Sequence, residues 1–261
     1  MIQNPKENKI PLLFVHIPKT GGGTVKNYFS YTKKNVTGER TGHSKLKEIN
    51  IKFYADPKSN LYPNNDFYNC IPFDNYFKFV IFRNPWERIL SEFNFRTRTH
   101  VLNIKNPLNP DLIKYWIEII KKKYNFKDWV LHLHEEVGIE NTIENYIYYN
   151  YITLDGKIGV DYIINLHNLN EDFELIKKIS NRTECLSIIK KASNGKNIHS
   201  KKHEFFKTYY DDKTIEIVEK IHAKDIELFN FSFDNYEYAD LEKFYNLEKI
   251  KNILQEIESI K

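Results

Sequence analysis

Residues 12–24 read LLFVHIPKTGGGT, and this stretch decides the expected fold. Residues 12–16 are an apolar run with β-branched and aromatic side chains, which predicts a buried parallel strand. Pro18 and three consecutive glycines end the run. From Thr24 onward the apolar residues recur at helical spacing. The stretch therefore predicts a strand, a glycine-rich loop and a helix in succession.

A second unit of the same form begins at residue 77. Residues 77–82 read FKFVIF and predict another buried strand. Asn84 is a natural helix N-cap, and Pro85 suits the first helical position. The apolar residues that follow have the spacing of a core-facing helix through residue 93.

Further strands and helices alternate along the rest of the chain. Residues 151–154 and 160–165 flank the pair Asp155-Gly156, which predicts a hairpin or a turn into a strand. Helices are expected over residues 171–179, capped by Asn170, and over 214–229 and 239–261. This alternation predicts an α/β class with one domain and a largely parallel sheet flanked by helices. We expect that domain to cover residues 1–234. Residues 235–261 then form a C-terminal amphipathic helical extension, packed on the domain or extending from it, through which the chain can self-associate.

Composition excludes several classes of protein. The chain has 261 residues, of which 41% are hydrophobic and 15% aromatic, so it is not intrinsically disordered. A net charge of +4 is too small for a dedicated nucleic-acid binder, and no nucleic-acid partner is expected. Cys70 and Cys185 are too few for a disulfide framework or a four-cysteine zinc site, so they are expected as reduced thiols or as one disulfide.

No segment has the roughly 18 consecutive apolar residues that a membrane-spanning helix needs. The first ten residues are polar, and the apolar run behind them is too short for a signal peptide. The sequence therefore predicts a cytoplasmic protein without a transmembrane segment.

The glycine-rich loop has the composition of an anion site. Gly21, Gly22 and Gly23 allow backbone N–H groups to approach a phosphate, and the following helix points its N-terminus at the same place. Lys19 adds a cation, and hydroxyl donors come from Thr20 and Thr24. The loop is P-loop-like without matching the Walker pattern, because the lysine precedes the glycines. A purely structural turn is the alternative.

The second motif is RNPWERILS, residues 83–91. Arg83 follows the second strand, and in open α/β sheets ligands bind beyond the carboxyl ends of the strands. Ser91 lies on the following helix, where its hydroxyl can join Arg83 on a second phosphate. Four of the six arginines fall between positions 83 and 98, and arginine is well suited to bind phosphate. The alternative is an arginine paired with an acid and a serine with no function.

Together, HIPKTGGGT and FRNPWERILSEF resemble the two nucleotide-binding motifs of the sulfotransferases. The most similar group contains the carbohydrate sulfotransferases and heparan sulfate 2-O-sulfotransferase. VDYIINLHNLNEDFELI and the segment that begins HSKKHEFF resemble later parts of the same family, so most of residues 11–234 is covered. Two departures are His167, where the family usually has glutamate, and an extra glycine in the first motif.

This resemblance implies a sulfotransferase that uses 3′-phosphoadenosine 5′-phosphosulfate (PAPS) as donor and releases 3′,5′-adenosine bisphosphate. Lys19, Thr20, Gly21–Gly23 and Thr24 would bind the 5′-phosphosulfate, and Arg83 and Ser91 the 3′-phosphate. The implied acceptor is a hydroxyl group, with carbohydrate as the first expectation. The chemistry that the family resemblance implies requires no metal.

The resemblance also points to a base and to a covering loop. Related enzymes have a histidine between the two motifs as catalytic base, which here is His43, and histidine suits proton transfer near neutral pH. Ser200 and Lys201 lie in a segment that covers the nucleotide in relatives. Ordinary loop residues are the alternative for all three. His132 and His134 have alternating spacing but no evident third ligand, and we interpret them as structural.

Two other functions remain open from the sequence. A P-loop nucleotide kinase or NTPase shares the sheet and the loop but requires the missing GK[ST] pattern. A non-catalytic module that binds anions or glycans on the same fold would show no turnover with PAPS.

Overall fold

The computed structural model describes residues 10–22, 25, 45–47, 73–97, 124–135, 147–180, 204–235 and 239–259. The chain divides by its internal contacts into two units. The first unit comprises residues 1–83, 148–197 and 239–261, and the second comprises residues 84–147 and 198–238. The predicted boundary at residue 234 stays a prediction.

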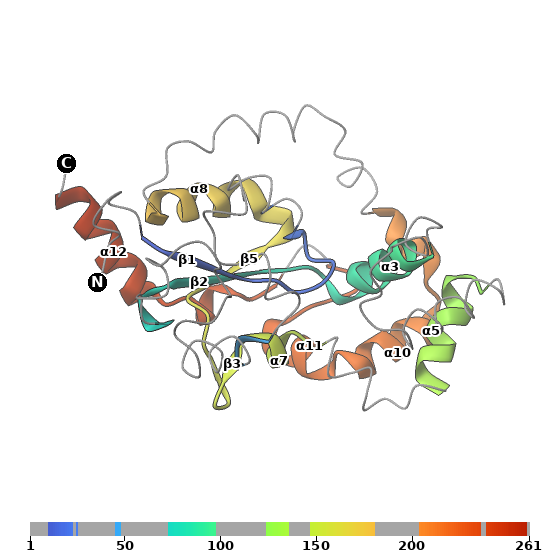
Figure 1. Cartoon of the computed structure of the whole chain (residues 1–261). Helices are drawn as coiled ribbons and strands as arrows, with labels where there is room; N and C mark the ends of the chain where they lie inside the picture. The colour runs from blue at the N-terminus through green and yellow to red at the C-terminus, as the bar shows by residue number, and fades with distance from the viewer. Residues whose placement is uncertain are drawn as a thin grey trace, which may run out of the picture. The chain divides into compact units, whose positions relative to one another are not determined.

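A three-stranded parallel sheet lies at the centre of the first unit (Figure 1). Its strands are β1 (Leu12–Val15), β2 (Phe77–Phe82) and β5 (Tyr162–Asn165), in the order β1-β2-β5. All three were expected from short apolar runs. The α/β class with a small parallel sheet flanked by helices is confirmed, while the P-loop-like character and the C-terminal extension stay predictions.

One face of the sheet forms the larger core. Phe79 lies opposite Phe14 on one neighbouring strand and Tyr162 on the other, with the Phe14 and Phe79 rings 5.2 Å apart. Helices α8 (Leu169–Ser180) and α12 (Leu247–Ser259) cover this face. Their buried contributions to the cluster are Phe173, Ile176, Ile179, Ile250 and Ile253.

The opposite face of the sheet is buried as well. Val15, Val80 and Phe82 point to this face and are at most 1% exposed. Figure 1 shows α7 (Tyr148–Ile152) on this side, away from α8, and the Tyr148 ring stacks on Phe82 at 4.5 Å. Burial on both faces explains why the strands are mostly apolar rather than alternating, with Lys78 of β2 and Asn165 of β5 as the polar residues.

Residues 153–158 form a hairpin at the expected turn, but its strands differ from the prediction: residues 151–152 belong to α7, and the later run pairs with β2 as β5 instead of with residues 151–154. Strands β3 (Thr153–Leu154) and β4 (Lys157–Ile158) pair antiparallel around Asp155 and Gly156. Both turn residues have positive φ, 47° and 78°, as a tight two-residue turn requires.

Helices make up most of the described part of the second unit. These are α3 (Pro85–Arg96), α5 (Phe126–Glu135), α10 (Asp212–Ile221) and α11 (Ala223–Phe229), with the 3-10 helix η5 (Glu204–Tyr209). Helix α10 contacts α3, α5 and α11. Every described helix, in either unit, is too short or too polar to cross a membrane.

The predicted cap of α3 is confirmed. The Asn84 side chain accepts a hydrogen bond from the Trp86 N–H at 3.1 Å and donates one to the Ser232 carbonyl oxygen at 2.8 Å. Pro85 occupies the first helical position. Trp86 then packs edge-on against Phe233, with the rings 5.7 Å apart.

Three helix boundaries differ from the sequence prediction. Residues 214–229 form two helices, because His222 leaves helical geometry with its ring buried against Asp225. Residues 239–261 are not one helix either. They contain the 3-10 helix η6 (Glu242–Phe244), an extended Tyr245 and then α12. Asn170 is not a cap, since α8 begins at Leu169.

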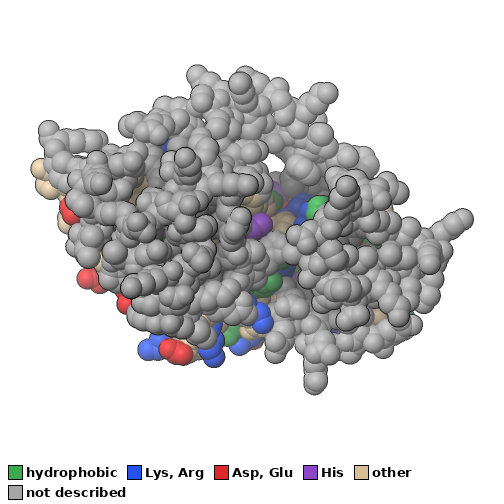
Figure 2. Space-filling view, viewed as in Figure 1, with side chains coloured by type: hydrophobic (Ala, Val, Ile, Leu, Met, Phe, Trp, Pro, Cys, Tyr) green, Lys and Arg blue, Asp and Glu red, His purple; other side chains and the backbone are tan. Residues whose placement is uncertain are grey.

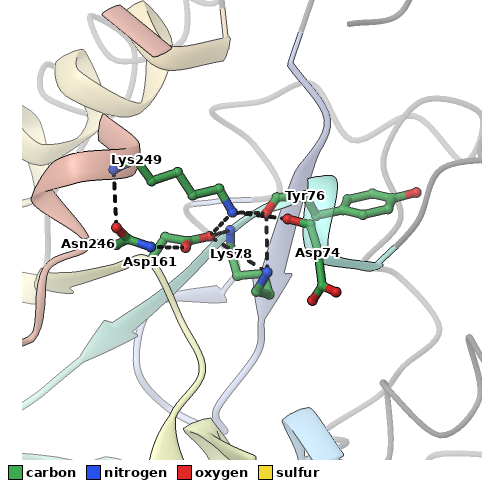
Figure 3. Close-up of polar contacts among 6 residues, drawn as sticks. All are labelled: Asp74, Tyr76, Lys78, Asp161, Asn246 and Lys249. Carbon is green, nitrogen blue, oxygen red and sulfur yellow. Dashed lines mark hydrogen bonds and ion pairs between the residues drawn. The ribbon is translucent and has the colours of Figure 1, made fainter. Parts of the chain in front are cut away.

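A buried carboxylate fastens the C-terminal segment to the sheet (Figure 3). Asp161 precedes β5, and its Oδ2 accepts hydrogen bonds from Lys249 Nζ and from the Lys78 N–H, each at 2.8 Å. Asn246 Nδ2 donates to the other carboxylate oxygen at 3.1 Å, and Lys249 Nζ also donates to the Tyr76 carbonyl oxygen at 2.8 Å. The carboxylate thus joins β2, β5 and α12.

The two lysines near Asp161 are not equivalent. Lys249 makes a close ion pair at 2.8 Å, whereas Lys78 Nζ lies 3.9 Å from the same oxygen and 4.9 Å from the centre of the Phe73 ring. Burial is the main cause that lowers the pKa of Lys78, and the nearby charge of Lys249 lowers it further, against the attraction of Asp161. Lys249 is therefore the main counter-ion of the carboxylate.

We expect Lys249→Met to lower the free energy of unfolding by about 3–5 kcal/mol, because it leaves a buried carboxylate without its main counter-ion. Lys78→Met should cost less than about 1 kcal/mol, since Asp161 keeps Lys249. Denaturant unfolding measures both. Lys243→Met is the control, because Lys243 pairs with Asp240 on the exposed surface at 2.9 Å and should contribute less than about 1 kcal/mol. Equal losses for Lys249→Met and Lys78→Met would contradict the assignment.

The lowered pKa of Lys78 predicts that the free energy of unfolding depends on pH. Because the pKa of Lys78 is lowered in the folded state, the unfolded chain binds more protons there as the pH rises. The contribution of Lys78 to stability therefore increases from the lowered pKa up to the ordinary lysine value near 10.5. Tyr162 and Tyr245, whose pKa values are raised, act in the opposite direction at high pH, so the test is the difference between two proteins. Over this pH range the stability of the parent should rise relative to that of Lys78→Met in unfolding experiments.

Candidate active site

The loop after β1 is held by its own backbone and side chains. Thr20 is fully buried, and its hydroxyl donates a hydrogen bond to the Ile17 carbonyl oxygen at 2.9 Å. Lys19 has φ 66°, in the left-handed region, which costs a non-glycine residue roughly 1 kcal/mol. The loop therefore presents Lys19 at a sharply turned point of the backbone.

Gly21 and Gly22 of the loop both occupy positions where a side chain would meet other atoms. Gly21 has φ 100°, and a β-carbon there would lie 2.9 Å from Leu166 Cδ1. A β-carbon at Gly22 would overlap the His16 imidazole, so that ring sits directly against the glycine backbone. His16 in turn stacks on Phe14, with the rings 5.5 Å apart. Any side chain at position 22 would displace His16 from this place.

A helical turn begins directly behind the loop. Gly22 and Val25 are helical, and the Val25 N–H donates to the Gly21 carbonyl oxygen at 3.3 Å. The first N–H groups of a helix have no partner within the helix, which makes them donors for an anion. The predicted order of strand, loop and helix start is therefore present in the described residues.

Arg83 and the loop are in contact. The side chain of Arg83, which follows β2, donates from Nη1 to the Lys19 carbonyl oxygen at 3.4 Å. Tyr148 donates from its hydroxyl to the carbonyl oxygen of Arg83 at 2.5 Å. The parallel pairing of β1 with β2 explains the meeting of residues 64 positions apart, because it brings the carboxyl ends of both strands to one edge. The two motifs are thus joined at that edge by a hydrogen bond.

The other predicted site residues fall elsewhere. Ser91 is half-buried on α3 of the second unit. The remaining predicted site residues lie outside the described residues: Gly23, Thr24, His43, Ser200 and Lys201. Cys70 and Cys185 lie outside them as well.

Buried charges in the second unit change the interpretation of the arginine cluster. Arg88 is only 1% exposed, so it is not part of a solvated basic helix face. His222 Nδ1 lies 3.1 Å from Asp225 Oδ2, and both side chains are completely buried. Burial lowers the pKa of His222, with the attraction of Asp225 opposing it and the charge of Arg88 adding to it. Sequence periodicity could not single out this pair, because both residues sit within an amphipathic helical pattern.

Asp172 is a further polar residue that the sequence analysis did not single out. Its carboxylate accepts from the Tyr162 hydroxyl at 2.7 Å and from the Asn165 N–H at 3.2 Å, and thereby holds the carboxyl end of β5. Burial raises the pKa of Asp172, against these hydrogen bonds. In the sequence, Asp172 lies three residues after Leu169, within VDYIINLHNLNEDFELI (residues 160–176), which resembles part of a known family. That position was the only sequence signal for Asp172.

Neither the described surface charges nor the histidines of α5 indicate a further site among the described residues. Figure 2 shows acidic and basic side chains together among the described residues of one face, in agreement with the small net charge of +4. His132 is buried on α5 with its ring 5.4 Å from that of Tyr124, and the side chain of His134 is not described. Among the described residues, no group of three or more His, Cys, Asp or Glu is placed to hold a metal ion.

Comparison with known proteins identifies the family. A family model described as "Sulfotransferase family" matches residues 6–232, which include both motifs and all of β1, β2 and β5. Comparisons with curated proteins and with solved structures return no match. The match spans most of the chain, and the protein belongs to the sulfotransferase family.

Proposed function

We propose that this sulfotransferase uses PAPS as donor and a carbohydrate hydroxyl as acceptor. The observation that carries the proposal is the hydrogen bond from Arg83 to the Lys19 carbonyl, because it joins the first residue of the second motif to the glycine-rich loop within one unit. A donor with phosphates at both ends of a nucleoside needs two anion sites, and ligands of open α/β sheets bind beyond the carboxyl ends of the strands. PAPS is such a donor, and it carries an activated sulfuryl group on its 5′-phosphate.

The loop of residues 19–24 would hold the 5′ end of the donor. Lys19 supplies a positive charge, and Gly21, Gly22 and Gly23 leave the backbone N–H groups accessible. Thr24 would add a hydroxyl donor at the start of the helix. The hydroxyl of Thr20 already donates to Ile17, so we assign the contact of Thr20 with the donor to its backbone N–H.

Arg83 would bind the 3′-phosphate while keeping its bond to the loop. A guanidinium has five N–H donors in a planar fork, so one arginine can serve a carbonyl oxygen and a phosphate together. Ser91, Ser200 and Lys201 are proposed as further contacts of the nucleotide. Recognition of the 3′-phosphate would separate PAPS from ATP.

The proposed transfer has two tasks for the protein. His43 takes the proton from the acceptor hydroxyl as its oxygen bonds to sulfur. Lys19 and the loop N–H groups neutralise the charge that develops on the bridging oxygen when the bond from sulfur to the 5′-phosphate breaks. No metal enters this scheme. Location in the cytoplasm and self-association through residues 235–261 also stay predictions.

The function is tested by binding and by turnover. The parent protein should be stabilised in a thermal-shift assay by 3′,5′-adenosine bisphosphate more than by ATP with magnesium, and should label a glycan when supplied with radiolabelled PAPS. Stabilisation by ATP alone would favour a kinase or NTPase. Binding of the bisphosphate with no transfer to any glycan, tyrosine peptide or small hydroxyl compound would favour a non-catalytic module.

Lys19→Ala should lower turnover by about 10²–10³-fold while changing the affinity for adenosine bisphosphate much less. The reason is that the ammonium group acts mainly on the bridging oxygen as the bond breaks. Steady-state rates and calorimetric affinities give the two numbers. The control is Lys157→Ala, which removes an exposed lysine of β4 in the same unit and should leave both unchanged. Parental turnover in Lys19→Ala would remove this lysine from the mechanism.

Arg83→Ala should weaken binding of 3′,5′-adenosine bisphosphate by roughly ten- to 150-fold, which is the range for loss of a charge-assisted hydrogen bond. Binding of AMP, which has no 3′-phosphate, should weaken much less. Calorimetry with both ligands measures the ratio. A uniform loss would mean that Arg83 only supports the loop through the Lys19 carbonyl.

His43→Ala should abolish transfer and leave nucleotide binding intact, since removal of a general base costs about 10²–10⁴ in rate. The parent should show one ionisation in its pH–rate profile near the ordinary histidine value of roughly 6.5, and the variant should lose it. If the variant keeps parental turnover, another group is the base, and His16→Ala is the next variant to measure.

A further inference from the structure

Tyr148 belongs to the aromatic run of residues 146–151, whose function the sequence leaves open. Its ring is completely buried and stacks on Phe82, the last residue of β2, with 19° between the ring planes. Its hydroxyl donates to the carbonyl oxygen of the next residue, Arg83. One side chain therefore contacts both residues at the point where β2 ends.

The helix that carries Tyr148 is itself firmly placed. Tyr151 and Ile152 of α7 are 3% and 0% exposed, and the Ile152 carbonyl oxygen accepts from the Gly159 N–H at 2.8 Å. The hairpin of β3 and β4 follows directly. Tyr148 is thus part of a buried helix, which lies on the side of the sheet away from α8 (Figure 1), and its hydroxyl position is fixed by the bond to Arg83.

The Arg83 backbone is the base from which its side chain reaches the loop. Arg83 lies one residue beyond β2, where the ladder to β5 has already ended with the pair Phe82 and Asn165. The hydrogen bond from Tyr148 holds the Arg83 carbonyl at that point. The guanidinium then extends to the carbonyl oxygen of Lys19, a residue in a left-handed conformation that the surroundings must maintain.

We propose that Tyr148 is a positioning residue that aims Arg83 at the loop and at the 3′-phosphate of the nucleotide. This rests on the proposed function of the site. The chain of contacts runs from the Tyr148 hydroxyl to the Arg83 carbonyl, and from the Arg83 guanidinium to the Lys19 carbonyl. Tyr148 touches neither the reacting atoms nor the ligand in this scheme.

The test compares two neighbouring tyrosines. Tyr148→Phe keeps the ring and removes the hydroxyl that holds Arg83. Tyr149→Phe removes a hydroxyl that donates to the Gly156 carbonyl oxygen at 2.8 Å, on the hairpin. We expect Tyr148→Phe to weaken binding of 3′,5′-adenosine bisphosphate by about five- to tenfold, the size of one ordinary hydrogen bond, and binding of AMP by much less. Tyr149→Phe should change neither affinity.

A double-mutant cycle separates positioning from general stability. In an Arg83→Lys background, Tyr148→Phe should have no further effect on affinity, because the group that it positions is already gone. The chain has only six arginines, so ¹⁵N-arginine spectra offer a second measurement. The side-chain signal of Arg83, assigned by its loss in Arg83→Lys, should shift in Tyr148→Phe and not in Tyr149→Phe. These spectra need no ligand and can be recorded even if Tyr148→Phe is less stable.

Equal affinity of the parent and Tyr148→Phe for the bisphosphate, or losses that add fully in the double variant, would overturn the positioning role alone. An unchanged Arg83 signal in Tyr148→Phe would overturn it as well. Failure of the parent protein to bind the bisphosphate would overturn the proposed function, and the positioning role with it.

Discussion

The parallel pairing of β1 with β2 determines where the chemistry of this protein can lie. Leu12 is in register with Phe77, and the two strands run in the same direction, so the residues that follow each strand meet at one edge of the sheet. In the proposed function neither motif would form the site alone, because residues 19–24 contain one cation and Arg83 follows a strand without a glycine-rich turn. The hydrogen bond between Arg83 and the Lys19 carbonyl is the visible consequence of this pairing.

Sequence reasoning succeeded where the deciding interactions are local. The apolar runs of β1 and β2 are buried on both faces, so their assignment as strands needed no knowledge of their partners. Asn84 caps α3 by accepting a hydrogen bond from the N–H of Trp86, two residues later. The Asp155-Gly156 turn depends only on the backbone conformations of its two residues. Such features follow from residue type and spacing alone.

Sequence reasoning failed where side-chain burial or a residue far away in the sequence determines where a helix begins or ends. The helix predicted over residues 214–229 is interrupted at His222, whose imidazole is completely buried 3.1 Å from the Asp225 carboxylate. Likewise, the helix predicted from residue 239 starts late, because Asn246 donates to Asp161 through both its side chain and its backbone. Amphipathic periodicity continues through both interruptions, so it carried no sign of them. For the site, the sequence predicted that Lys19 and Arg83 converge, but it gave no reason to expect that Tyr148 of α7 contacts the end of β2.

The glycines of the loop have two physical explanations, one in the packing of the protein and one in the proposed binding of an anion. A glycine-rich turn before a helix suggests access for a phosphate, yet at Gly21 and Gly22 the packing of the protein already forbids a side chain. Leu166 occupies the space at one position and His16 the space at the other. In the proposed function, this close packing at two loop positions would help to orient the N–H groups before a ligand arrives. Preorganisation of this kind is what makes backbone dipoles effective toward a developing charge. The internal packing requirement and the proposed anion site are therefore two consequences of the same tight turn.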